Sequence, residues 1–193
     1  SIEKKITPKT KAIMVVHYGG NPCDMDEIRK IGRKYRLPVI EDAAHAMYTP
    51  GAGKKADITM YSFQAVKSMP IFDGGMITTN DDEIYTRLRN LTWLGIEKST
   101  YERAIGKRFS WDYDLTEVDA IKGYMADVQA VIGLCQLERI DELLAKRRAV
   151  QSIYNEAFRD MKQIKIPTFS YTCQYYTGQF ERINAGRLQG TVP

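Results

Sequence analysis

A strand, a helix and a second strand follow one another between residues 11 and 42, and this order constrains the fold more than any other feature. Residues 11–16 (KAIMVV) are apolar and rich in β-branched side chains, which is typical of a buried strand. Asp24 stands where a helix N-cap belongs, and apolar side chains recur at helical spacing over residues 25–35. Residues 38–42 (PVIED) predict the next strand. Such a unit requires a parallel pair of strands, so we expect an α/β fold.

The rest of the chain continues to alternate strands and helices. Residues 58–63 and 76–79 predict two further short strands, and residues 81–93 predict a helix. A long helical region begins near Ala126 and extends to about Met161. Residues 168–180, rich in Tyr and Thr, predict another strand. Residues 97–117 are polar and aromatic without a clear period, so we expect a loop there.

Composition argues against several classes of protein. The 193 residues are 44% hydrophobic and 27% charged, as in an ordinary globular protein. The net charge of +4 comes from basic residues interleaved with acidic ones, which argues against a nucleic-acid partner. The three cysteines lie far apart without a CxxC pair, which argues against a disulfide framework or a metal site and predicts a reducing, cytoplasmic location. The sequence has no run of about 18 apolar residues, so we expect no membrane span.

Polar side chains gather where the predicted strands end. Asp42 ends one strand, Ser62 lies at the end of another, Lys67 lies on the loop that follows, and residues 73–75 (DGG) predict a tight turn. Ligands of parallel α/β sheets bind outside the carboxyl ends of the strands. An acid, a hydroxyl, an amine and a glycine turn are what a phosphorylated aldehyde cofactor would need. Each also has a plain structural explanation, such as a helix cap for Asp42 or a solvated side chain for Lys67.

Several ordered motifs resemble one family of enzymes. The runs VIEDAAHA (residues 39–46), YSFQAVKSMP (61–70) and DGGMITTND (73–81) are similar to those of the nucleotide-sugar aminotransferases of the DegT/DnrJ/StrS type. The stretches KTKAIMVVHYGG, RLRNLTWLGI and YMADVQAVIGLCQLERID resemble the same family in the same order. The resemblance extends roughly over residues 6–158.

The resemblance implies fold type I of the transferases that depend on pyridoxal 5'-phosphate (PLP). This fold has a mainly parallel central sheet flanked by helices, followed by a smaller C-terminal domain. Residues 1–145 would be part of the large PLP-binding domain, without its N-terminal portion. Residues 146–193 would be a linking helix and the start of the small domain. Chains of the family are about twice as long, as two domains require, so we expect a partial chain that is inactive alone.

The resemblance also implies roles for five residues. Lys67 matches the lysine that forms the Schiff base with PLP, and it argues against the related sugar dehydratases, which have histidine there. Asp42 matches the carboxylate that pairs with the pyridine nitrogen and keeps it protonated. His45 matches a residue near the phenolic oxygen of the cofactor, and Ser62 matches a hydroxyl that binds its phosphate. Lys122 lies near a position that reaches the phosphate from a neighbouring subunit.

Each of the last three assignments has an alternative. His45 could be a structural histidine, Ser62 an ordinary serine at a strand end, and Lys122 a solvated loop lysine. His17 is typical of the family at a strand end, and we interpret it as structural. The chain has Phe72 where the family has glycine before its acid-Gly-Gly turn. Because phenylalanine adopts positive φ only at a cost, we expect a rearranged loop after Lys67.

Two functions follow from these observations. In the first, the parent protein is a cytoplasmic homodimer with composite active sites, which transfers an amino group from glutamate to a keto sugar on a nucleotide carrier. Such a reaction belongs to bacterial amino-sugar or cell-surface polysaccharide biosynthesis. In the second, the chain is a non-catalytic homologue or inactive fragment that serves as a dimer or ligand-binding scaffold. Lys67 and Asp42 together favour the first for the parent protein.

Overall fold

A four-stranded sheet forms the centre of the molecule. The computed structural model describes residues 1–105, 114–162, 164–166 and 179–180. The strands β1 (Ile13–Val16), β2 (Val39–Asp42), β3 (Ile58–Ser62) and β4 (Gly75–Thr79) lie side by side in that order. The first three are parallel and β4 is antiparallel to β3. The prediction of a mainly parallel sheet is therefore confirmed, with an antiparallel edge strand that the sequence did not indicate.

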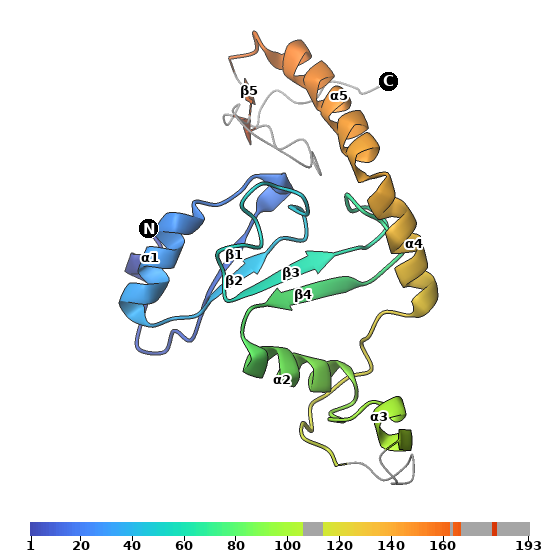
Figure 1. Cartoon of the computed structure of the whole chain (residues 1–193). Helices are drawn as coiled ribbons and strands as arrows, with labels where there is room; N and C mark the ends of the chain where they lie inside the picture. Colours follow the sequence, from blue (N-terminus) through green and yellow to red (C-terminus); the bar gives the residue numbers. More distant parts are fainter. Residues whose placement is uncertain (106–113, 163, 167–178, 181–193) are drawn as a thin grey trace, which may run out of the picture.

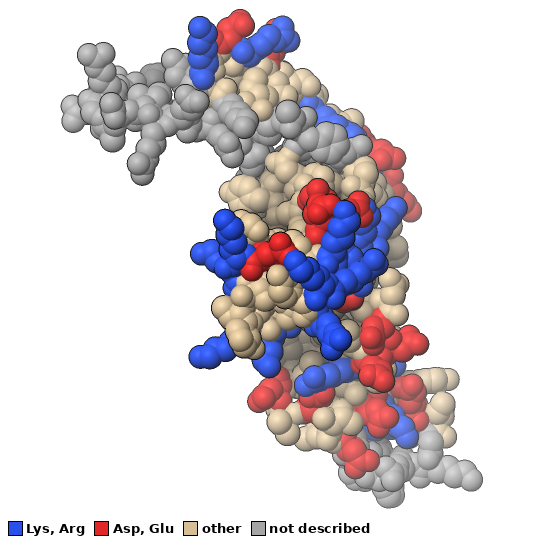
Figure 2. All heavy atoms as spheres, turned by 90° about the vertical axis from the view of Figure 1, so that its left-hand side faces the viewer, with Lys and Arg blue, Asp and Glu red and all other residues tan. Residues whose placement is uncertain are grey.

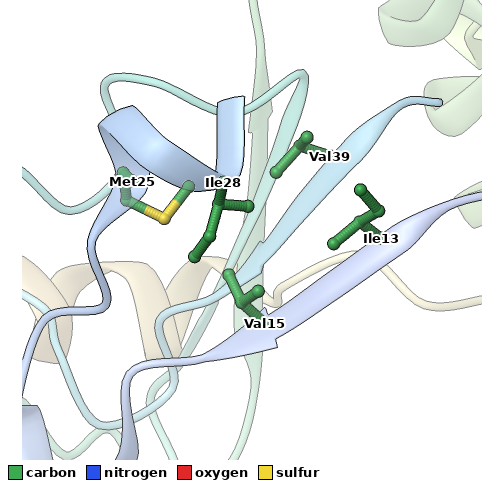
Figure 3. Close-up of a cluster of buried hydrophobic side chains, with 5 residues drawn as sticks. All are labelled: Ile13, Val15, Met25, Ile28 and Val39. Carbon is green, nitrogen blue, oxygen red and sulfur yellow. The ribbon is translucent and has the colours of Figure 1, made fainter. Parts of the chain in front are cut away.

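Helix α1 (Met25–Tyr35) covers one face of the sheet at β1 and β2. Its start is the predicted one, because the Asp24 carboxylate accepts a hydrogen bond from the backbone N–H of Glu27 (3.1 Å). Side chains from β1, α1 and β2 form a buried apolar cluster that Figure 3 shows: Ile13, Val15, Met25, Ile28 and Val39. In β1 and β2 every second side chain is buried against this helix, so the intervening side chains belong to the opposite face.

Two consecutive helices pack against the loop between β3 and β4. Helices α4 (Asp127–Glu138) and α5 (Ile140–Phe158) run along the side of the sheet away from α1 (Figure 1). The sequence predicted one helical region here, but Arg139 leaves the helical conformation (φ −107°, ψ 7°) and separates the two helices. Ile140 and Leu144 of α5 are buried with side chains of the loop between β3 and β4, namely Phe63, Met69 and Ile71.

The remaining described elements are shorter. Helix α2 (Asp82–Thr92) begins after Asp81, whose carboxylate accepts hydrogen bonds from two backbone N–H groups. The predicted loop over residues 97–117 is wrong in part, because it contains helix α3 (Thr100–Ile105), while residues 106–113 lie outside the described residues.

Two more pairs of short elements complete the fold. Two single turns of 3₁₀ helix are η1 (Glu3–Lys5) and η2 (Tyr18–Gly20). Of the strand predicted over residues 168–180, the described part is β6 (Gln179–Phe180), which pairs with β5 (Ile164–Lys165); residues 168–178 lie outside the described residues. Within the described segments, no helix is both long enough and apolar enough to cross a lipid bilayer.

Candidate functional site

The ends of β2 and β3 bring the candidate side chains to one edge of the sheet. Asp42 is the last residue of β2 and Ser62 the last of β3, and the two strands are parallel. Asp42 pairs with Met60, so Ser62 extends beyond it on the neighbouring strand. Glu41 is buried on the α1 side, and alternation along the strand therefore puts Asp42 on the opposite face. This edge is the one where ligands of parallel sheets bind.

Asp42 is half-buried and shapes the turn that follows it. Its Oδ1 accepts a hydrogen bond from the backbone N–H of Ala44 (3.0 Å). The chain then continues in turns, in which the N–H of Ala46 donates to the carbonyl of Ala43 (2.9 Å). No helix begins at this point, so the alternative of Asp42 as a helix cap is wrong.

His45 lies close enough to Asp42 and Lys67 for both charges to act on its imidazole. Burial lowers the pKa of His45, the positive charge of Lys67 lowers the pKa further, and the negative charge of Asp42 opposes both. The backbone N–H of Gly19 donates to Nδ1 of His45 (3.3 Å), and the ring of Tyr18 meets the imidazole edge-on with centroids 5.7 Å apart. The fold therefore brings the amine of Lys67, from a later motif, close to the neighbouring acid and imidazole of Asp42 and His45.

Lys67 lies on a loop that helices α4 and α5 hold in place. The lysine is half-buried, and its carbonyl oxygen accepts a hydrogen bond from the guanidinium of Arg147 (3.1 Å). Near the end of the same loop, the carbonyl of Asp73 accepts from the side-chain amide of Gln129 (3.0 Å). The loop is also closed on itself, because the N–H of Phe63 donates to the carbonyl of Gly74 (2.9 Å). These contacts fix the backbone of the loop that carries Lys67.

Phe72 adopts a left-handed backbone conformation. Its φ is 76°, in the left-handed region that glycine enters most easily, and its side chain is 72% exposed. The N–H of Ala65 donates to its carbonyl (2.9 Å), which keeps the loop closed. Phe72 thus takes the positive φ that we expect to be costly, and the expectation of a rearranged loop after Lys67 stays a prediction.

Ser62 and Lys122 differ in their surroundings. The Ser62 hydroxyl is at the same edge as Asp42 and accepts a hydrogen bond from the N–H of Gln64 (3.4 Å). Lys122 is exposed, and its ammonium lies over the rings of Trp93 (6.0 Å) and Tyr124 (5.8 Å). Within the described part of the chain, Lys122 makes no hydrogen bond or ion pair with the other four candidate residues.

Sequence reasoning missed the residues that support the site. Arg147 and Gln129 hold the Lys67 loop from helices distant in the chain, and no local pattern indicates this. Glu41 had a local signal, since it is a charged residue in an apolar strand, and it is fully buried. Facing it, His17 is also fully buried, with Nε2 3.6 Å from Glu41 Oε2. This agrees with the interpretation of His17 as structural.

The four residues at this edge suit PLP. Asp42 offers a carboxylate for a protonated ring nitrogen, Lys67 an amine for the aldehyde, Ser62 a hydroxyl for the phosphate, and His45 a ring nitrogen for an oxygen substituent. The lowered pKa of His45 favours its neutral form, which can donate one hydrogen bond. Among the described residues, no cluster of His, Cys, Asp and Glu is arranged to hold a metal ion.

One hollow lies at the other edge of the sheet, away from the candidate residues. It has a volume of about 1070 Å³ and is lined by basic side chains, among them Arg29, Arg33, Arg36 and Lys54, and by Asp57. Figure 2 shows Lys and Arg gathered on the side of the molecule that bears α1, with acidic side chains among them. Arg29 is paired with Asp57 (2.6 Å), so part of this charge is neutralised locally. The hollow contains none of the five candidate residues.

Comparisons with known proteins place the chain in a family. The model of the DegT/DnrJ/EryC1/StrS aminotransferase family matches residues 1–181. The spore coat polysaccharide biosynthesis protein SpsC of Bacillus subtilis is 38% identical over 170 residues, which are 86% of this chain and 43% of SpsC. The chain spans less than half the length of the curated relatives it matches.

Solved structures agree in fold. The sugar aminotransferase CalS13 from Micromonospora echinospora has a TM-score of 0.75 and 30% identity, over 93% of this chain and 51% of CalS13. The PMP form of Spr1654 from Streptococcus pneumoniae has a TM-score of 0.78 and 29% identity, over 93% of this chain and 52% of Spr1654. The expected fold of the PLP-dependent transferases is thereby confirmed, and the chain belongs to the DegT/DnrJ/EryC1/StrS aminotransferase family.

Proposed function

We propose that the protein to which this chain belongs is a PLP-dependent sugar aminotransferase that binds its cofactor covalently through Lys67. The observation that carries the proposal is the meeting of Asp42, His45 and Lys67 at one edge of the sheet, where both charges act on the imidazole. The likeness to SpsC and CalS13 supports a sugar substrate. The family resemblance supports glutamate as amino donor and a keto sugar on a nucleotide carrier as acceptor.

Each residue has a distinct task in this proposal. Bound PLP supplies an electron sink for the carbon that gains or loses the amine. Asp42 holds a proton on the ring nitrogen, because a carboxylate beside it favours the charged form. Lys67 would hold the cofactor through its aldehyde carbon, and its amine, when not so bonded, would move a proton. The Ser62 hydroxyl binds the phosphate, and His45 orients the ring through its oxygen substituent.

The first test is covalent labelling of the full-length protein. Borohydride reduction of the PLP-bound protein should attach the cofactor to Lys67, which peptide mass spectrometry will locate. Lys122, exposed between two aromatic rings, serves as the comparison lysine in the same digest. A label on another lysine, or bound PLP without any label, would rule out Lys67 and favour the alternative of a non-catalytic scaffold.

A second test isolates the charge of Asp42. The Asp42→Asn variant should still accept the label at Lys67 but should transaminate orders of magnitude more slowly, because an amide does not keep the ring nitrogen protonated. Asp57→Asn is the matched control, since Asp57 is also a half-buried carboxylate but lies at the opposite edge of the sheet. Near-normal turnover by Asp42→Asn would contradict the assigned role.

We further propose that Lys122 serves the site of a partner subunit in a homodimer. Its ammonium lies over the rings of Trp93 and Tyr124, and in the described structure it contacts none of the other four candidate residues, which supports a role at the site of a second copy of the chain. Mixing inactive Lys67→Ala with inactive Lys122→Ala should restore activity, because mixed dimers contain one site with both lysines. If the mixture stays inactive although mixed dimers form, Lys122 acts within its own subunit or not at all.

A further inference from the structure

Glu41 and His17 form a polar pair that is buried on the side of the sheet away from Asp42. Both side chains are fully inaccessible, and His17 Nε2 lies 3.6 Å from Glu41 Oε2, which is longer than a hydrogen bond. In the described structure His17 Nε2 and Glu41 Oε1 have no hydrogen-bond partner. Buried polar atoms left without partners are costly, so stability alone does not account for this pair.

The two side chains accept hydrogen bonds from the backbone of two turns. His17 Nδ1 accepts a hydrogen bond from the N–H of Cys23 (3.1 Å), which closes the segment of residues 17–23, here called the 17–23 turn. Glu41 Oε2 accepts hydrogen bonds from the N–H of Gly53 and from the hydroxyl of Thr59 (3.4 Å). The 17–23 turn is also tied to β2, because the N–H of His17 donates to the carbonyl of Asp42 (3.0 Å).

The 17–23 turn contacts the imidazole of His45. Gly19 and Gly20 both have positive φ (63° and 85°), and this conformation directs the Gly19 N–H to Nδ1 of His45 (3.3 Å). A ring nitrogen that accepts a hydrogen bond carries no proton, so the proton of the neutral imidazole is on Nε2. Burial and the charge of Lys67 lower the pKa of His45 and so favour that neutral form.

We propose that His17 and Glu41 are positioning residues that, through the 17–23 turn, hold His45 in the tautomer with its proton on Nε2. Glu41 attracts the Nε2–H of His17, which leaves His17 Nδ1 as the acceptor for Cys23. The fixed turn then presents the Gly19 N–H to His45. The use of the His45 Nε2–H as a donor to the cofactor rests on the proposed function, whereas the tautomer itself does not.

The test reads the tautomer directly by NMR. Full-length protein with ¹⁵N-labelled histidine rings is examined with and without PLP, and the His45 signals are assigned with a His45→Gln variant. In the unmodified protein Nε2 of His45 should be protonated and Nδ1 should not. In His17→Ala the two tautomers should mix, because the turn loses its bond to Cys23. His17→Asn should restore the single tautomer, because its amide oxygen replaces Nδ1 as acceptor for the Cys23 N–H.

Two further variants are needed. Glu41→Gln tests the charge of Glu41, and Asn90→Ala is a control. Glu41→Gln retains an acceptor for Gly53 but loses the charge that faces His17, so the minor tautomer of His45 should increase. Asn90 is buried and donates to Thr116 (3.0 Å), so its replacement by alanine controls for a general loss of buried hydrogen bonds and should leave His45 unchanged. In the active protein, His17→Ala should lower kcat roughly 10–100-fold, as loss of residues that orient ligand histidines does elsewhere, with little change in KM.

The outcomes distinguish the two proposals. An unchanged His45 tautomer in folded His17→Ala and Glu41→Gln would overturn the positioning role, whatever the activity. If His17→Ala does not fold, Glu41→Gln decides by the same measurement. A shifted tautomer in a protein that shows no label at Lys67 would support the positioning role while the proposed function fails.

Discussion

Replacing Gly53 by alanine should destabilise the protein far more than the same change at Gly51, two residues earlier in the same loop. Both glycines have positive φ, 76° at Gly53 and 90° at Gly51. A Cβ at Gly53 would lie 1.8 Å from the hydroxyl oxygen of Tyr61, whereas a Cβ at Gly51 meets no atom within 4 Å. The two substitutions therefore share the backbone strain and differ in the collision.

The magnitudes follow from these contacts. Left-handed backbone costs an L side chain about 1–2 kcal/mol, and the reduced entropy of the unfolded chain offsets about 0.4–1 kcal/mol of it. Gly51→Ala should therefore cost roughly 1 kcal/mol. Gly53→Ala should cost about 1–3 kcal/mol more, because the half-buried ring of Tyr61 must move and the Gly53 N–H is drawn away from Glu41.

The assay is urea denaturation of the full-length protein, with a double-mutant cycle that includes Tyr61→Phe. Without the hydroxyl, the nearest ring atom to the new Cβ is Cζ at 3.1 Å, which a small shift can accommodate. The cost of Gly53→Ala should then fall toward that of Gly51→Ala, with a coupling energy of roughly 1–3 kcal/mol. Equal losses at the two glycines, or no recovery in the Tyr61→Phe background, would refute the reasoning.

Three further predictions concern stability. Burial raises the pKa of Asp57, but hydrogen bonds from Arg29 (2.6 Å) and the Val39 N–H (2.7 Å) outweigh it and hold the pKa below its usual value. Asp57→Asn should therefore cost about 2 kcal/mol at neutral pH. In urea titrations this difference in unfolding free energy should begin to shrink as the pH falls below about 4, where the Asp57 carboxyl of the unfolded chain becomes protonated, and should be lost as the pH falls through the lower pKa of the folded state; a difference independent of pH would contradict this. Phe72→Gly should be about 1 kcal/mol more stable than Phe72→Ala, because only glycine relieves the positive φ, and equal denaturation midpoints would disprove the strain. Gly32→Ala should be destabilising despite a gain of about 1 kcal/mol in helix propensity, because its Cβ would lie 2.7 Å from Val39 Cγ2, and a raised midpoint would show that α1 can shift.

The sequence by itself determined most of the local elements and indicated the candidate site residues. The start of α1 was predictable because the Asp24 cap and the apolar spacing act within one helical turn. The strands β1 to β3 were predictable because buried parallel strands consist of short apolar runs. Asp42 and Lys67 were recognisable because the motifs around them are long and follow one another in the order that the family has.

The direction of β4 and the break at Arg139 depended on tertiary structure. Residues 76–79 indicate a strand in either direction, and the closed loop between Phe63 and Gly74 returns the chain beside β3 as an antiparallel neighbour. The region from Ala126 has helical propensity throughout, and the packing of Ile140 against the Lys67 loop accompanies the break in the helical conformation at Arg139. Both features arise from contacts between segments that are remote in the chain.

The surroundings of the site residues were likewise decided only by the folded chain. Alternation along β2 puts Asp42 on the face opposite α1 and Glu41 against His17. The motif alone does not show that these neighbouring acids face opposite sides of the sheet. The partner of His45 is Gly19, 26 residues away, and the partner of the Lys67 carbonyl is Arg147, 80 residues away. Local sequence patterns carry propensity and periodicity, which are short-range, whereas burial and hydrogen-bond partners arise when distant segments pack, so the electrostatic state of the site is a property of the tertiary structure.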